Sequence, residues 1–195
     1  VAAVLDRALA AGVARVVTVG IDLASSRRAV DLAGRHDRVW AAVGVSPNDL
    51  AGHGPGSMRE LAELSRSERV VAIGEIGLDY HWLRWPAQAQ QAAFREQLEL
   101  AGDRGLPVIV HSRKAHEDTL AALAEWSAGR PRTERPLGVM HCFSGDADLA
   151  RAYTALGMAV SLAGNVTYPG ARALRSVAAE ACRDCLVLET DSPYM

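Results

Sequence analysis

A short, wholly apolar run that ends in a carboxylate between two glycines constrains this chain more than any other feature. Residues 70–73 are Val-Val-Ala-Ile, and Gly74, Glu75, Ile76 and Gly77 follow at once. Because no polar residue interrupts the run, it predicts a strand buried on both faces, as in a parallel sheet. The glycines predict a sharp turn of the backbone where the strand ends. We therefore expect Glu75 at the rim of a sheet, either solvated or available to a cation.

Three further apolar runs, at residues 106–110, 137–140 and 185–188, end in a similar way. Each leads into side chains that can bind a metal ion: His111, His141, and Glu189 with Asp191. The carboxyl ends of the strands of a parallel barrel converge on one face, where such folds carry their chemistry. Histidine and carboxylate ligands without a thiolate suit zinc, manganese or iron, and suit magnesium less well.

Strands and helices are expected to alternate along the whole chain. The predicted strands are 15–20, 39–45, 70–73, 106–110, 137–140, 159–162 and 185–188, and we expect the first of them to be buried. Helices are expected at 1–12, 23–36, around 58–64, from Pro86, around 120–126, at 146–156 and at 171–181, with Asp22 capping the second. Such alternation makes a parallel sheet with right-handed crossovers. No linker or break in composition divides residues 1–195, which we expect to form a single domain.

Five motifs resemble, in the same order, the signatures of the TatD family. They are Gly-Glu-Ile-Gly-Leu-Asp-Tyr (74–80), Val-His-Ser-Arg (110–113), His-Cys-Phe-Ser-Gly (141–145), Ser-Leu-Ala-Gly-Asn (161–165) and Glu-Thr-Asp-Ser-Pro-Tyr (189–194). That family comprises metal-dependent deoxyribonucleases of the amidohydrolase superfamily, built on a TIM barrel. Five ordered motifs are far more specific than any one of them. The resemblance implies an α/β fold of the TIM (β/α)8 type.

The resemblance also implies that the barrel is incomplete. A family member should open with a strand that bears His-x-His, but this chain opens with a predicted helix and does not begin with methionine. It stops soon after Asp191, and its 195 residues compare with about 250 for a typical barrel. We expect a domain truncated at both ends, without the first strand and the last helix. Its edge strands at 15–20 and 185–190 would then lack partners and favour self-association.

The functional residues are carried over by the same resemblance. The expected metal ligands are Glu75, His111, His141 and Asp191. Glu75 is expected to bridge two divalent ions (Mg, Mn or Zn), and Asp191 to take a proton from the attacking water. Because the two histidines of the first strand are absent, we expect this chain to hold one ion and to be weakly active or inactive. The expected substrate contacts are Arg113, Ser46 and Asn165.

Some roles have a second interpretation. Glu189 and Asp79 are expected to orient neighbouring ligands. Asn165 could serve a turn rather than contact a substrate. The remaining histidines, His36, His53, His81 and His116, are expected at the surface. At residue 46 the family has histidine within Gly-x-His-Pro, whereas this chain has Ser46, which keeps a hydrogen bond but loses an ionisable group.

The resemblance predicts a divalent-metal-dependent hydrolase that cleaves phosphodiester bonds in DNA, at ends or in single strands. Because Ser46 replaces the family histidine, a second hypothesis is a hydrolase of the amidohydrolase superfamily that acts on a small ester, amide or lactone. A third hypothesis is a catalytically inactive barrel remnant. We infer no obligate protein partner. The net charge of −2 and the pI of about 6.3 argue against tight nonspecific binding of duplexes. No apolar run reaches the roughly 20 residues of a membrane span. Three cysteines, of which Cys182 and Cys185 are judged ordinary rather than redox-active, fit a cytoplasmic protein.

Overall fold

The strands form one parallel sheet that follows the order of the chain. The computed structural model describes residues 1–131, 134–180 and 183–194, and within them seven strands pair in the order β1 to β7. The strands are β1 Val16–Val19, β2 Val39–Val43, β3 Val70–Asp79, β4 Val108–Arg113, β5 Gly138–Met140, β6 Met158–Leu162 and β7 Leu186–Leu188. Every neighbouring pair is parallel, as the sequence predicted.

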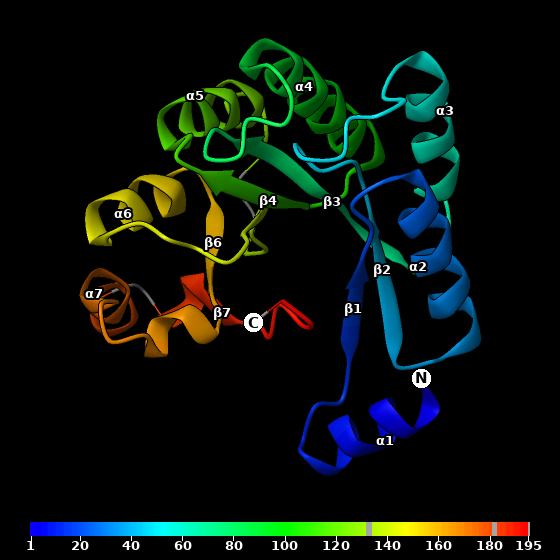
Figure 1. The fold of residues 1–195 in the computed structure, drawn as a ribbon, viewed down its shortest axis with the longest axis horizontal. Coiled ribbons are helices and arrows are strands. Elements are labelled where there is room, and N and C mark those ends of the chain that lie inside the picture. Colours follow the sequence, from blue (N-terminus) through cyan, green and yellow to red (C-terminus); the bar gives the residue numbers. More distant parts are fainter. Residues whose placement is uncertain (132–133, 181–182, 195) are drawn as a thin grey trace.

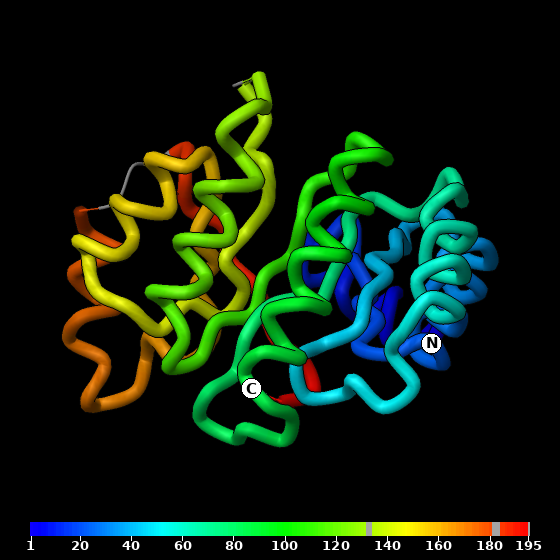
Figure 2. The backbone as a smooth tube through the Cα atoms, turned by 90° about the horizontal axis from the view of Figure 1, so that it is seen from above, coloured from blue at the N-terminus to red at the C-terminus, as the bar shows by residue number. Residues whose placement is uncertain are grey.

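The helices are α1 Ala2–Ala10, α2 Leu23–Arg35, α3 Pro55–Leu64, α4 Ala87–Arg104, α5 His116–Ser127, α6 Ala147–Ala155 and α7 Arg172–Glu180. Short 3₁₀ turns cover Gly164–Thr167 and Arg183–Cys185. Helices α2 to α7 form an arc outside the strands, which curve into a half-barrel (Figure 1). Seen from above, the helices follow the order of the chain, and the C-terminal segment lies between the first and last of them (Figure 2). The predicted incomplete barrel of the TIM type is confirmed.

The two outer strands expose apolar side chains. Val17 and Val19 of β1 are 46% and 36% exposed, and Leu188 of β7 is 85% exposed. The prediction that the strand at 15–20 is buried is therefore wrong, because its side chains alternate between covered and exposed positions. The reason is its place at the edge of the sheet, where the described part of the chain supplies a neighbour on one side only.

Helix ends follow local hydrogen bonding. Asp22 caps α2 as predicted, since its carboxylate accepts a hydrogen bond of 2.6 Å from the backbone N–H of Ser25. Asp146 caps α6 by accepting a bond of 2.9 Å from the N–H of Leu149.

Among the described residues, no helix combines the length and apolar character needed to cross a bilayer. Cys182 lies outside the described residues.

Helix α4 fixes the ends of two central strands with buried glutamines. Gln97 accepts a bond of 2.7 Å from the N–H of Val45 and donates one of 3.0 Å to its carbonyl. Gln90 does the same for Asp79 at the end of β3, at 2.8 and 3.1 Å. Both amides are almost fully covered, so each must be satisfied by the backbone it meets. The strand ends behind the candidate site are thereby held to the helix layer.

The sequence predicts a strand that ends at Ile73, before Glu75, but β3 continues to Asp79. Its glycines allow close approach of neighbouring strands instead of ending the strand. A Cβ atom on Gly74 would lie 2.5 Å from Cβ of Ile109, and one on Gly77 would lie 2.0 Å from the carbonyl oxygen of His111. Gly77 also has φ +135°, which a residue with a side chain rarely adopts. The register with β4 shifts between Ile73 and Ile76, so the irregular segment brackets Glu75.

Candidate metal centre

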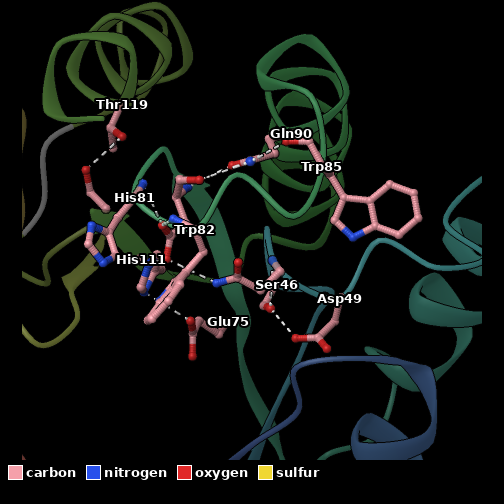
Figure 3. A network of polar contacts seen from close by, with 12 residues as sticks. Ser46, Asp49, Glu75, His81, Trp82, Trp85, Gln90, His111 and Thr119 are labelled. Atoms are coloured by element: carbon pink, nitrogen blue, oxygen red, sulfur yellow. Dashed lines mark hydrogen bonds and ion pairs between the residues drawn. The ribbon is translucent and has the colours of Figure 1, made fainter. Parts of the chain in front are cut away.

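The first half of the candidate site lies on β3 and β4. The Nδ1 atom of His111 is 3.3 Å from Oε1 of Glu75, while its Nε2 atom is 3.0 Å from Oδ2 of Asp79 (Figure 3). Because the ionised Asp79 carboxylate can only accept a hydrogen bond, Nε2 is its donor and Nδ1 is the ring nitrogen directed at Glu75. The sequence offered no cationic partner close to Glu75 in the chain, and the structure brings His111 to it from the next strand.

Asp79 is a buried carboxylate with a full set of donors. It is 1% exposed, and its oxygens accept bonds from the side chain of Asn48 at 3.1 Å and from the N–H groups of His81 and Trp82 at 2.9 and 3.0 Å. Burial alone would raise the pKa of Asp79, but these hydrogen bonds and His111 hold it well below its usual range. Asp79 therefore remains ionised and orients the His111 ring, the role that the sequence suggested for it.

The second half repeats this arrangement after β5 and β7. Nδ1 of His141 is 2.9 Å from Oε2 of Glu189, and its Nε2 is 3.7 Å from Oδ1 of Asp191. Glu189 also accepts a bond from the backbone N–H of Cys142. Burial favours neutral His141, yet Glu189, Glu75 and Asp191 outweigh it and raise the pKa of His141 to about 9. The ring is thus held by one carboxylate and aimed at another.

Two residues of this half have left-handed backbones. Cys142 has φ 44° and Asp191 has φ 50°, conformations that cost energy for residues with a side chain. Cys142 directly follows the predicted ligand His141, and Asp191 is itself a predicted ligand. Burial and the nearby carboxylates Asp191, Glu189 and Glu75 raise the pKa of the Cys142 thiol to about 12, so it stays protonated. The predicted ligand set without a thiolate is consistent with that.

The donor atoms fit a divalent ion of borderline softness. Each histidine has one nitrogen fixed by a carboxylate, as metal-binding histidines commonly do. Its other nitrogen is directed at a second carboxylate. The four predicted ligands form two pairs, Glu75 with His111 and His141 with Asp191. The two pairs also influence each other electrostatically. Glu75 is one of the carboxylates that raise the pKa of His141. Burial raises the pKa of Asp191 overall, and His111 opposes that increase. Within the described residues, no group of three or more histidine, cysteine, aspartate or glutamate side chains lies close enough together to hold a metal ion.

The three predicted substrate contacts have different surroundings. Arg113 is exposed, and its guanidinium lies 5.4 Å from the centre of the Trp82 ring. Ser46 is 3% exposed and donates a bond of 2.6 Å to Asp49, so its hydroxyl is already engaged. Asn165 donates to the carbonyl of Phe143 at 3.2 Å, and its side-chain oxygen is buried without a partner in the described structure.

Three of the four histidines that were expected at the surface are partly covered. His53 has a side chain only 12% exposed, which lies 3.0 Å from Glu96. His116 is half-buried, with Nδ1 3.0 Å from the hydroxyls of both Ser112 and Tyr153, and burial lowers its pKa. Their partners come from other elements, which no local pattern shows. His81 is exposed as predicted, whereas His36 is partly covered.

Sequence reasoning also missed Asn48, Gln90 and Trp82, although all three touch Asp79. Only Trp82 carried a signal that could have found it. A large aromatic residue three positions after the motif carboxylate, in a predicted loop, has no core to enter.

A family model described as TatD related DNase matches residues 1–195. The chain belongs to the TatD family. This TatD-family chain is 39% identical over 98% of its length to the "Uncharacterized metal-dependent hydrolase YabD" of Bacillus subtilis, of which it covers 73%. It is 37% identical to the "3'-5' ssDNA/RNA exonuclease TatD" of Enterobacter lignolyticus, with 99% of this chain and 73% of that protein covered.

Among solved structures, the TatD homologue YJJV from Escherichia coli K12 superimposes with a TM-score of 0.89 at 35% identity. The match covers 97% of the TatD-family chain and 72% of that structure. These likenesses make the chain a member of a family of metal-dependent hydrolases with TIM-type barrels, as the motifs predicted.

The His141–Glu189 pair predicts how stability depends on pH in the metal-free TatD-family chain. The pKa of His141 is about 9 when folded, against 6.5 for a free histidine, so the pair stabilises fully below pH 6.5 and the benefit is lost as pH rises through about 9. The loss is on the order of 3 kcal/mol. Urea unfolding in chelator between pH 6 and 10 would measure it. His141→Gln should flatten this alkaline limb, and an unchanged limb would contradict the assignment.

Proposed function

We propose that the protein carrying this chain hydrolyses phosphodiester bonds in DNA, releasing nucleotides from single strands or ends with the help of divalent metal ions. The observation that carries the proposal is the repeated carboxylate–histidine–carboxylate arrangement. Asp79, His111 and Glu75 form one copy, and Glu189, His141 and Asp191 form the other. The nuclease names of some relatives support phosphodiesters as the substrate class.

Metal binding, proton transfer and substrate binding are each assigned to particular residues of the site. Glu75, His111, His141 and Asp191 would hold the metal. Bound there, divalent ions supply polarisation of a phosphoryl oxygen and a lowered pKa of water. Asp191 would also take the proton of an attacking water. In the metal-free chain burial raises the pKa of Asp191, against the opposing charge of His141. Arg113, exposed at the end of β4, is available for a phosphate oxygen.

A hydrolysis assay tests this function. The chain would be incubated with Mn²⁺, Mg²⁺ or Zn²⁺ and a single-stranded oligonucleotide labelled at either end, with and without chelator. Because the four proposed ligands would hold one ion well and a second only weakly, we expect slow release of mononucleotides that chelator abolishes. Turnover of small esters or lactones with intact DNA would favour the alternative hydrolase. Absence of both activities together with absence of metal uptake would favour an inactive barrel.

We expect the chain to bind one divalent ion appreciably and a second only weakly. The resemblance to the family assigns Glu75, His111 and His141 to one ion, for which the two pairs of the described structure would have to approach each other. Asp191 would have to hold another ion almost alone. Metal analysis after dialysis, with a Mn²⁺ titration, would give the stoichiometry. His111→Ala and His141→Ala should each weaken the same ion, and His81→Ala should not. Two tightly retained ions per chain would contradict this expectation.

A further inference from the structure

Trp82 is an exposed indole beside the candidate metal centre. Its exposed fraction is 57%, whereas the other tryptophans, Trp40, Trp85 and Trp126, are each partly covered. It extends from the loop between β3 and α4 toward the region of His111 and Glu75 (Figure 3). Leaving a large aromatic surface in water is costly, so an isolated indole next to a polar site is a candidate ligand contact.

The indole is held in place rather than loosely attached. The backbone N–H of Trp82 donates a bond of 3.0 Å to Asp79, the same carboxylate that orients His111. Its ring meets that of His81 edge-on at 4.7 Å between centroids. The Arg113 guanidinium lies 5.4 Å from the centre of the indole, within range of a cation–π contact. A flat apolar surface and a positive charge are therefore presented together at the site.

We propose that Trp82 stacks a nucleobase of a single-stranded nucleic acid while Arg113 binds the adjoining phosphate. The inference rests on the proposed function and names the part of the substrate that this site recognises. Every base has a π-face, so stacking on an indole accepts any sequence but requires an unpaired base. In a duplex the faces of the internal bases are already stacked and unavailable.

The charge of the chain points the same way. Its formal net charge is −2, so its composition supplies no overall excess of positive charge for duplex phosphates. Affinity has to come from local contacts, and one indole with one guanidinium forms such a contact. Single strands are therefore favoured over duplexes at this position.

Binding in chelator separates recognition from hydrolysis. A fluorescein-labelled oligo-dT would be titrated by anisotropy with the wild-type chain and with Trp82→Ala, Trp82→Phe and Leu83→Ala. Trp82→Ala should weaken binding by about fivefold to a hundredfold, the range for loss of one stacked base. Trp82→Phe should keep most of the affinity because it keeps a π-face. Leu83→Ala, which truncates a neighbouring side chain that is 55% exposed, should bind like wild type.

Two further measurements identify the stacking itself. Unlabelled oligo-dT should quench tryptophan fluorescence in wild type and much less in Trp82→Phe, although both bind. An abasic strand of equal length should bind wild type as weakly as oligo-dT binds Trp82→Ala. Equal affinity of wild type and Trp82→Ala for oligo-dT, alongside chelator-sensitive hydrolysis, would overturn the stacking role and leave the proposed function standing. Binding that depends on Trp82, without any hydrolysis, would support the stacking role and contradict the proposed function.

Discussion

Replacing Glu75 with alanine is expected to reduce phosphodiester hydrolysis to the rate seen in the presence of chelator. Glu75 faces Nδ1 of His111 at 3.3 Å and contributes to the high pKa of His141, so it is the proposed ligand that connects the two halves of the site. Metal catalysis supplies several kcal/mol of transition-state stabilisation, and its loss corresponds to a decrease of about 10³-fold. Rates with Mn²⁺ at saturating oligonucleotide would measure the decrease.

Arg113→Ala is the matched comparison for Glu75→Ala. Arg113 lies at the end of the neighbouring strand but is exposed and is proposed to contact substrate only. Its loss should raise KM with a smaller change in kcat, and should leave the Mn²⁺ affinity unchanged. If the two variants kept comparable residual rates and equal metal affinity, Glu75 would be a structural residue rather than a ligand.

Gly77→Ala is expected to destabilise the fold by about 3 kcal/mol or more. The new Cβ would lie 2.0 Å from the carbonyl oxygen of His111, a backbone atom, and φ +135° is unfavourable for alanine. Either β3 or β4 must move, which separates Glu75 from His111. We therefore expect metal affinity and stability to fall together. Urea unfolding and Mn²⁺ titration of the same preparation would test both.

Gly34→Ala is the control for this substitution. Gly34 lies near the end of α2, and a Cβ there would meet nothing within 4 Å. Alanine is the better helix former and restricts the unfolded chain, so the free energy of unfolding should rise by about 0.5 kcal/mol. A loss of stability in both variants, or in neither, would show that close strand approach does not explain Gly77.

The order of elements and the ligand candidates could be predicted because they depend on local sequence. Unbroken apolar runs marked the strands, and Asp22 and Asp146 marked helix starts through side-chain caps. The candidate ligands approach one another because parallel strands bring their ends together, so that His111 meets Glu75 across β3 and β4. Resemblance to the TatD family added the roles of individual residues, which periodicity alone does not contain.

What the sequence did not show depends on pairings between distant elements. The Gly74 and Gly77 motif was interpreted as a strand end, but its lack of Cβ atoms serves contact with Ile109 and His111. The support of Asp79 by Asn48 and Gln90 joins three separate segments. The burial of His116 depends on Tyr153 in α6. Such contacts become visible only when the packing of helices on the sheet is known.

The open edges of the sheet predict that the stability of this chain depends on its concentration. Val17 and Val19 on β1 and Leu188 on β7 are exposed beside backbone groups that lack a strand partner in the described structure. Self-association through these edges would bind the folded form and, by mass action, raise its apparent melting temperature with protein concentration. Melting curves over a hundredfold range of concentration, read beside sedimentation velocity, would reveal it. A melting temperature independent of concentration, with a monomer throughout, would show that the two edge strands do not cause self-association.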